Sequence, residues 1–215
     1  MTLYDLKPRF QGLLRPLVAA LAGAGVTANQ VTVVAAVGSL LLGLSLAMAP
    51  TRLVFLVVPA WLFARMALNA VDGMLAREHG QASPLGACLN EIGDVFSDAA
   101  IYLPFALVPG IGAGWVVVVV VLSGLTELAG VLGTTIGASR RYDGPAGKSD
   151  RAFLFGLLGL LVGLGVELPQ WAGWVMPALA ALLAVTVGRR VRSAVAEVRG
   201  APSGTMTYGV PPGGE

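Results

Sequence analysis

The amino-acid sequence predicts an all-α, polytopic membrane protein with six transmembrane helices and an amphipathic juxtamembrane helix before them. Of its 215 residues, 56% are hydrophobic and only 12% are charged, whereas an average soluble protein has about 25% charged residues. The apolar runs are long and do not alternate with polar residues, which favours helices over the strands of a barrel. The single cysteine excludes an internal disulfide and a multi-cysteine zinc site.

Six apolar segments can each cover the hydrocarbon layer of a membrane, which needs ~20 helical residues. The predicted spans are residues 28–48, 52–77, 84–108, 114–137, 151–168 and 170–188. They form a transmembrane domain at 26–190. Residues 1–25 mix Lys and Arg with leucines, which is the pattern of an amphipathic segment that lies on the membrane surface. Pro8 and Pro16 interrupt this pattern. Residues 191–215 form a tail whose Gly-, Pro- and Ser-rich end is expected to be disordered.

The distribution of positive charge predicts the orientation. Twelve of the 14 Lys and Arg residues flank the spans on one side, and the positive-inside rule places that side in the cytoplasm. Both termini are therefore expected to be cytoplasmic, in agreement with an even number of spans. The composition, rich in Ala, Gly, Val and Arg but poor in Lys, suggests a GC-rich bacterial genome, and the expected location is the inner membrane of a bacterium. The twelve are Lys7, Arg9, Arg15, Arg77, Arg140, Arg141, Lys148, Arg151, Arg189, Arg190, Arg192 and Arg199.

Polar and small residues recur at helical spacing in the second and third spans. At 100° per residue, one face of the second span carries Asn69, Asp72, Gly73 and Ala76. Ser83, just before the third span, is suited to cap its helix. Gly86, Asn90, Asp94 and Asp98 then follow at intervals of four residues, about one helical turn each. Acidic and amide groups at membrane depth are typical of a functional site. Their oxygens are ligands for hard cations such as Mg²⁺ or Mn²⁺, so we expect the two faces to oppose one another near the cytoplasm.

This spacing resembles the signature of the CDP-alcohol phosphatidyltransferases, D-x2-D-G-x2-A-R-x8-G-x3-D-x3-D. Matching positions are Asp72, Gly73, Ala76, Arg77, Gly86 and Asp94. The likeness extends to residues 26–32 and to Gly147 and Lys148. It implies a catalytic transmembrane domain that moves a phosphatidyl group from CDP-diacylglycerol, or a similar CDP-lipid, to an alcohol acceptor and releases CMP. It also implies a homodimer, with membrane lipids and no nucleic acid as partners.

The resemblance also implies roles for individual residues. Asp94 takes the position of the family's usual candidate general base. The expected metal ligands are Asn69, Asp72, Asn90, Asp94 and Asp98. The CDP-lipid is expected to contact Asp72, Gly73, Ala76, Arg77, Ser83 and Gly86. An anionic acceptor is expected to contact Arg140, Arg141 and Lys148, which otherwise serve only as topology signals or bind lipid headgroups.

Two departures from the signature change the expected metal site. Asn69 and Asn90 stand where the family has its first and third aspartates, and an amide supplies an oxygen without a charge. Three outcomes follow: one metal binds, Asp98 or Glu91 compensates, or chemistry is lost and only CDP-lipid binding remains.

Two further interpretations concern the protein as a whole and its isolated charges. A catalytically silent CDP-lipid-binding or scaffold protein is the alternative function. A transporter is disfavoured, because the polar cluster lies near one membrane face and the sequence has no inverted repeat. Arg65 and Glu127 lie deep in spans, where they either pair with polar neighbours or line the cavity.

Overall fold

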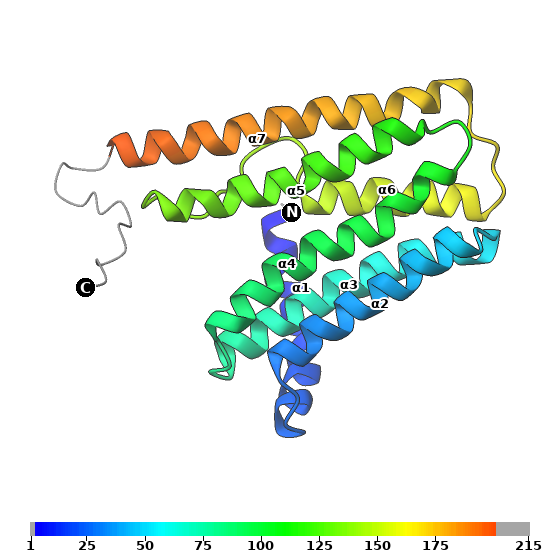
Figure 1. Cartoon of the computed structure of the whole chain (residues 1–215). Coiled ribbons are helices and arrows are strands. Elements are labelled where there is room, and N and C mark those ends of the chain that lie inside the picture. Colours follow the sequence, from blue (N-terminus) through cyan, green and yellow to red (C-terminus); the bar gives the residue numbers. More distant parts are fainter. Residues whose placement is uncertain (1–2, 201–215) are drawn as a thin grey trace, which may run out of the picture. The chain divides into compact units, whose positions relative to one another are not determined.

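The computed structural model of the chain describes residues 3–200, with side chains from residue 10 onward, and every regular element in that range is helical. The predicted all-α class is therefore confirmed. Figure 1 shows the helices in chain order. They are α1 (Leu3–Gly23), α2 (Ala28–Met48), α3 (Arg52–Glu78), α4 (Pro84–Tyr102), η1 (Leu103–Leu107), α5 (Ala113–Thr135), α6 (Lys148–Gly163), η2 (Gln170–Trp174) and α7 (Val175–Gly200).

Each of the six predicted spans contains a helix, but four of the helical stretches are long and apolar enough to cross a membrane. Those four are Ala28–Met48, Arg52–Glu78, Ala113–Thr135 and Gln170–Gly200. The other two differ for physical reasons. Three carboxylates interrupt the apolar character of the 19-residue α4, and α6 has only 16 residues. The count of six membrane crossings stays a prediction.

The ends of the chain differ from the expected boundaries. Helix α1 continues through Pro8 and Pro16, although the two prolines predict interruptions. Its exposed Leu13 and Leu17 and its buried Val18 fit the predicted amphipathic helix. Helix α7 runs on to Gly200, well past the predicted end of the last span. The tail end expected to be disordered, residues 201–215, lies outside the described residues.

The chain divides into two compact units. The first contains α1 to α3, nearly all of α4 and the C-terminal half of α6. The second contains η1, α5, the start of α6, η2 and α7. Each unit contains one of the two polar clusters described below.

The core of the first unit joins α1, α2 and α3. Buried apolar side chains from the three helices pack together, and they hold the amphipathic α1 beside the C-terminal end of α3. An exposed ion pair between Arg15 and Glu78, at 3.2 Å, links the same two helices. The core residues are Val18, Ala28, Val31, Val71, Met74 and Leu75.

Polar contacts fix the start of α2 beside the loop that follows α3. Thr27 and Gln30 form a capping box, in which each side chain satisfies a backbone N–H at the start of α2. Gln81, in the loop between α3 and α4, accepts a hydrogen bond from the Ala28 N–H at 2.7 Å and donates to the Val26 carbonyl at 3.3 Å. The stretch 26–32 is thereby held beside the loop that lies inside the signature.

The second unit is built on the packing of α5 against α7, which lie side by side in Figure 1. Two glycines of α5 let the loop between α5 and α6 lie close to the helix. A Cβ on Gly130 would lie 2.8 Å from the Arg141 carbonyl oxygen, and one on Gly133 would lie 3.0 Å from the Ser139 carbonyl oxygen. This close approach positions the basic residues of the loop.

Candidate active site

Two donor groups make three contacts with Asp94 in the first unit. The Asn69 amide donates to Asp94 Oδ1 at 3.0 Å. The Arg65 guanidinium donates to the same oxygen at 3.4 Å and to the Asp94 backbone carbonyl at 3.1 Å. The structure therefore brings together Asn69 of α3 and Asp94 of α4, which the sequence placed on facing helices.

The same guanidinium also holds Asp98. Arg65 Nη1 lies 2.6 Å from Asp98 Oδ1, and both residues are buried, with 3% and 4% of their surface exposed. Of the two interpretations of Arg65, pairing with polar neighbours is thus what the structure shows. A guanidinium in a membrane-spanning segment is stabilised by such carboxylate partners.

The Asp72 carboxylate accepts a hydrogen bond from a side chain of another helix, α2. Thr32 of α2 donates its hydroxyl to Asp72 Oδ2 at 2.8 Å and also contacts the Ala28 carbonyl at 3.1 Å. Asp72 is 6% exposed. Thr32 was not among the site residues predicted from the sequence. The only indication of its role was that it belongs to the stretch 26–32, which resembles the family.

The predicted metal ligands are not gathered into one group. Within residues 3–200, no cluster of three or more His, Cys, Asp or Glu side chains could hold a metal ion. Asp98 is turned to Arg65. Asn69 contacts Asp94, whereas Asp72 contacts Thr32 of α2. Asn90 is half-buried on α4.

The small residues of the motif make room for neighbouring polar side chains. A Cβ on Gly73 would lie 3.1 Å from Arg77 Nη1, so this glycine admits the Arg77 guanidinium from one turn later. A Cβ on Gly86 would lie 2.6 Å from Asn29 Oδ1, which adds Asn29 to the residues around the motif.

The remaining two residues expected at the CDP-lipid have structural contacts. Ser83 Oγ accepts a hydrogen bond from the Gly86 N–H at 3.0 Å, which confirms the predicted cap at the start of α4. Ala76 packs against the apolar core that α1, α2 and α3 share.

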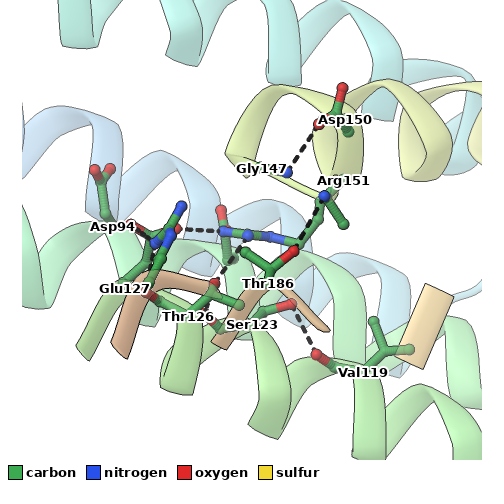
Figure 2. Close-up of polar contacts among 12 residues, drawn as sticks. Asp94, Val119, Ser123, Thr126, Glu127, Gly147, Asp150, Arg151 and Thr186 are labelled. Atoms are coloured by element: carbon green, nitrogen blue, oxygen red, sulfur yellow. Dashed lines mark hydrogen bonds and ion pairs between the residues drawn. The ribbon is translucent and has the colours of Figure 1, made fainter. Parts of the chain in front are cut away.

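The second unit contains a group of guanidinium ions around Glu127, which we call the arginine cluster: Arg140, Arg151 and Arg190. The three Arg–Glu127 nitrogen–oxygen distances are 3.9, 2.9 and 3.7 Å, respectively. Figure 2 shows Arg151 reaching the Glu127 carboxylate and the Thr126 hydroxyl of α5, the latter at 3.1 Å. Glu127, like Arg65, therefore pairs with polar neighbours.

Two of these arginines are buried, unlike arginines that only determine membrane orientation from the surface. Arg151 is 0% exposed and Arg190 is 3% exposed. Arg190 also donates to the backbone carbonyls of Thr126 and Asp143, the second at 3.2 Å. Sequence reasoning placed Arg151 and Arg190 only among the cytoplasmic charges, because their partners lie 24 residues or more away in the chain.

Arg141 has a different environment from Arg140. Its guanidinium pairs with Asp143 at 2.8 Å and with Glu197 of α7 at 2.6 Å. Glu197 also accepts hydrogen bonds from the Ser139 N–H and hydroxyl, each at 2.8 Å. The Arg141 hydrogen bond holds the pKa of the Asp143 carboxyl below its usual value. These contacts join the loop to α7.

Lys148 begins α6 and is half-buried. Next to it, the Gly147 N–H donates to Asp150 Oδ2 at 2.8 Å, a contact drawn in Figure 2. The structure thus places the predicted acceptor residues in three settings: Arg140 in the arginine cluster, Arg141 in ion pairs with α7, and Lys148 at a helix start.

The solved structures to which this chain is similar include two crystal structures of phosphatidylinositol phosphate synthase (PgsA1) from Mycobacterium tuberculosis. The structure with CDP-DAG bound has a TM-score of 0.68 at 20% sequence identity and covers 87% of this chain and 94% of that chain. The structure in complex with manganese and citrate has a TM-score of 0.65 at 20% identity, with 93% and 95% covered. At this identity the likeness concerns the fold.

Sequence comparisons give the family. The chain is 52% identical over 174 residues to the inner membrane protein YnbA of Escherichia coli (strain K12), which corresponds to 81% of this chain and 85% of the relative. Residues 25–187 match the profile of the CDP-alcohol phosphatidyltransferases. This match covers α2 to α6 and much of α7, and the structure places the signature on α3 and α4. The chain belongs to the CDP-alcohol phosphatidyltransferase family.

Proposed function

We propose that this protein transfers a phosphatidyl group from CDP-diacylglycerol, or a similar CDP-lipid, to an alcohol acceptor. The acceptor oxygen forms a bond to the phosphorus of the lipid phosphate, the bond from that phosphorus to CMP breaks, and Asp94 takes the hydroxyl proton. The observation that carries the proposal is the placement of Asp94, whose carboxylate is held by Arg65 and Asn69 on a helix face that matches the family signature. A carboxylate fixed in this way is suited to general-base work.

Asp72, Asp94 and Asn69 would hold a divalent cation, Mg²⁺ or Mn²⁺. Their oxygens are hard ligands, and the related fold of PgsA1 has been solved in complex with manganese and citrate. When bound, the cation would neutralise charge on the pyrophosphate of the CDP-lipid. Arg77, with its guanidinium over Gly73, would contribute a second positive charge there.

We propose an anionic acceptor, because three guanidinium groups lie together around the Glu127 carboxylate in the arginine cluster. Buried charges are stabilised by ions of opposite sign, and guanidinium groups bind phosphate through paired hydrogen bonds. Arg140 is the predicted acceptor residue that belongs to this cluster, and Arg151 and Arg190 join it in the proposal. Arg141 and Lys148 stay predicted acceptor residues.

The proposed setting is the inner membrane of a bacterium, with both termini and the site on the cytoplasmic side. The E. coli relative carries the name of an inner membrane protein, and the positive charges favour this orientation. A homodimer is expected from the family resemblance.

The test is CMP release by the purified protein in lipid nanodiscs. The protein is given CDP-diacylglycerol with glycerol phosphate, inositol phosphate, serine or an uncharged polyol, and CMP and the new lipid are measured by mass spectrometry. We expect release that depends on a phosphate-bearing acceptor and stops when a chelator removes Mg²⁺ and Mn²⁺. Saturable CDP-lipid binding with no CMP release for any acceptor would support the catalytically silent alternative. Release unaffected by the chelator would contradict the metal assignment.

A further inference from the structure

One face of α7 holds the loop between α5 and α6 at three points. Thr186, Arg190 and Glu197 follow at intervals of four and seven residues, so at 100° per residue they share a helix face about 40° wide. The Thr186 hydroxyl accepts a hydrogen bond from the Ala146 N–H at 3.2 Å, and Arg190 donates to the Asp143 carbonyl at 3.2 Å. Glu197 contacts the start of the loop. The loop therefore runs along α7 in the direction opposite to the helix.

Glu197 fixes the start of the loop through two residues. Its carboxylate accepts hydrogen bonds from the Ser139 N–H and hydroxyl, each at 2.8 Å, and lies 2.6 Å from the Arg141 guanidinium. Arg140, between these two residues in the chain, instead reaches Glu127 of α5 at 3.9 Å. Because both neighbours of Arg140 are held on α7, their contacts determine where Arg140 enters the arginine cluster.

Helix α5 confines the same part of the loop from the other side. The Arg141 N–H donates to the Gly130 carbonyl at 3.1 Å. A Cβ on Gly130 or on Gly133 would lie within 3.0 Å of a loop carbonyl oxygen, so the backbone of the loop lies close against the helix. Glu197 is exposed, and its charge can therefore be removed without disturbing the packed side of the loop on α5.

The contacts of Glu197 come from a part of the chain that the family profile does not describe, since the matched residues are 25–187. We propose that Glu197 is a positioning residue for the acceptor: it holds the start of the loop on α7 so that Arg140 faces the arginine cluster. Glu197 acts through the loop and does not itself contact the acceptor. The inference rests on the proposed function for an anionic acceptor, but it is measured by binding without catalysis.

A double-mutant cycle between Glu197 and Arg140 provides the test. The purified full-length protein in phosphatidylcholine nanodiscs is titrated with inorganic phosphate, and the dissociation constant is measured by calorimetry. Glu197→Gln should weaken phosphate binding about threefold, as expected for the loss of one exposed ion pair. A purely electrostatic influence has the opposite sign, because removal of a carboxylate favours the binding of an anion.

The second arm of the cycle shows whether Glu197 acts through Arg140. Arg140→Gln should also weaken phosphate binding, and the double variant should bind phosphate no more weakly than Arg140→Gln alone. Glu167→Gln, which removes an exposed carboxylate elsewhere, is the matched control and should leave the dissociation constant unchanged in both backgrounds.

Four outcomes would overturn the inference. They are no phosphate binding by the wild-type protein, binding that Arg140→Gln leaves unchanged, binding that Glu197→Gln leaves unchanged or strengthens, and equal weakening by Glu197→Gln with and without Arg140. Size-exclusion chromatography and thermal unfolding establish that each variant is folded. If Glu197→Gln does not fold, Ser139→Ala removes one hydrogen bond to Glu197 and should give a smaller weakening that again disappears in Arg140→Gln.

Steady-state CMP release separates the inference from the proposed function. Glu197→Gln should raise the Michaelis constant for a phosphate-bearing acceptor about threefold, and leave kcat and the constant for CDP-diacylglycerol nearly unchanged. Phosphate binding that follows the cycle without any CMP release would contradict only the function. Normal release together with phosphate binding that Glu197→Gln does not weaken would contradict only the inference.

Discussion

At the scale of the residue, Asp94 is held more firmly than its place in an apolar helix would suggest. One amide and one guanidinium donate to its carboxylate, and the same guanidinium reaches its backbone carbonyl. Such contacts limit the rotation of the carboxylate. A fixed orientation suits the role of proton acceptor that we propose for Asp94.

The first prediction is that Asp94→Asn abolishes CMP release with little change in expression or folding. Asparagine has nearly the same shape but cannot take a proton, and loss of a general base lowers rates by about 10²–10⁴-fold. Release is measured with purified protein, and Glu167→Gln, at an exposed position, serves as the control. Turnover near that of the wild type in Asp94→Asn would exclude Asp94 as the base.

At the scale of the element, glycines decide how closely helices pack in the first unit. A Cβ on Gly159 of α6 would lie 2.9 Å from the Val58 Cβ and 3.2 Å from the Phe55 carbonyl oxygen of α3. Small residues that allow such approach are typical of helix pairs in membranes. The position of α3, and with it the placement of Asn69 and Asp72, depends on this contact.

The second prediction compares two substitutions of glycine by alanine. Gly159→Ala overpacks the contact with α3 and is expected to destabilise the protein by about 1–3 kcal/mol. Gly188→Ala on α7 meets no atom within 4 Å and is expected to stabilise slightly, by about 0.5–1 kcal/mol, because alanine loses less entropy in a helix. Thermal unfolding in detergent measures both. Equal melting temperatures for the two variants would contradict the packing argument.

The loop between α5 and α6 is a second element whose position depends on a few polar contacts. Arg141 and Ser139 join it to Glu197 of α7, and Arg141 also pairs with Asp143. Because Arg141 lowers the pKa of Asp143, this pair stabilises the loop above the ordinary aspartate pKa of about 3.9. The contribution is lost as the pH falls through the lower pKa of the folded state.

The third prediction is that Glu197→Gln loosens this loop. The substitution removes the charge that pairs with Arg141, so hydrogen exchange of residues 136–147 should become faster at neutral pH. In the wild-type protein the same acceleration should appear only in acid, once Asp143 is protonated. Glu167→Gln is the control. Unchanged exchange in Glu197→Gln would show that other contacts hold the loop.

At the scale of the whole molecule, the local patterns of the sequence were sufficient for the helices and the motif. Apolar runs predicted six helical segments, and the spacing from Asn69 to Asp94 was enough to indicate the family. The sequence could not predict the partners of buried charges, since no spacing rule links Arg65 to Asp98 or Glu127 to Arg190. These pairs join residues 33 and 63 positions apart, which only the packing of helices brings together.

The same reasoning applies to the residues proposed to bind the acceptor. Sequence analysis selected Arg140, Arg141 and Lys148 because they are basic and lie in one predicted loop. In the structure these three have different partners, and two buried arginines that the sequence presented as topology signals lie with Arg140 around Glu127. Burial, which determines how strongly a charge attracts an anion, follows from the tertiary fold.

The last prediction concerns the charge of the acceptor. Arg140 is about 30% exposed, contacts Glu127 at 3.9 Å and has its guanidinium 5.1 Å from the centre of the Tyr142 ring. It can therefore be changed with less risk to folding than the buried Arg151 or Arg190. Arg140→Gln should raise the Michaelis constant for a phosphate-bearing acceptor about tenfold, as expected for one charge-assisted hydrogen bond, and leave that for CDP-diacylglycerol nearly unchanged. Steady-state CMP release measures both constants, with the exposed Arg192→Gln as a control that removes the same charge. Equal effects of the two substitutions would indicate a general electrostatic influence, and no effect of either would favour an uncharged alcohol.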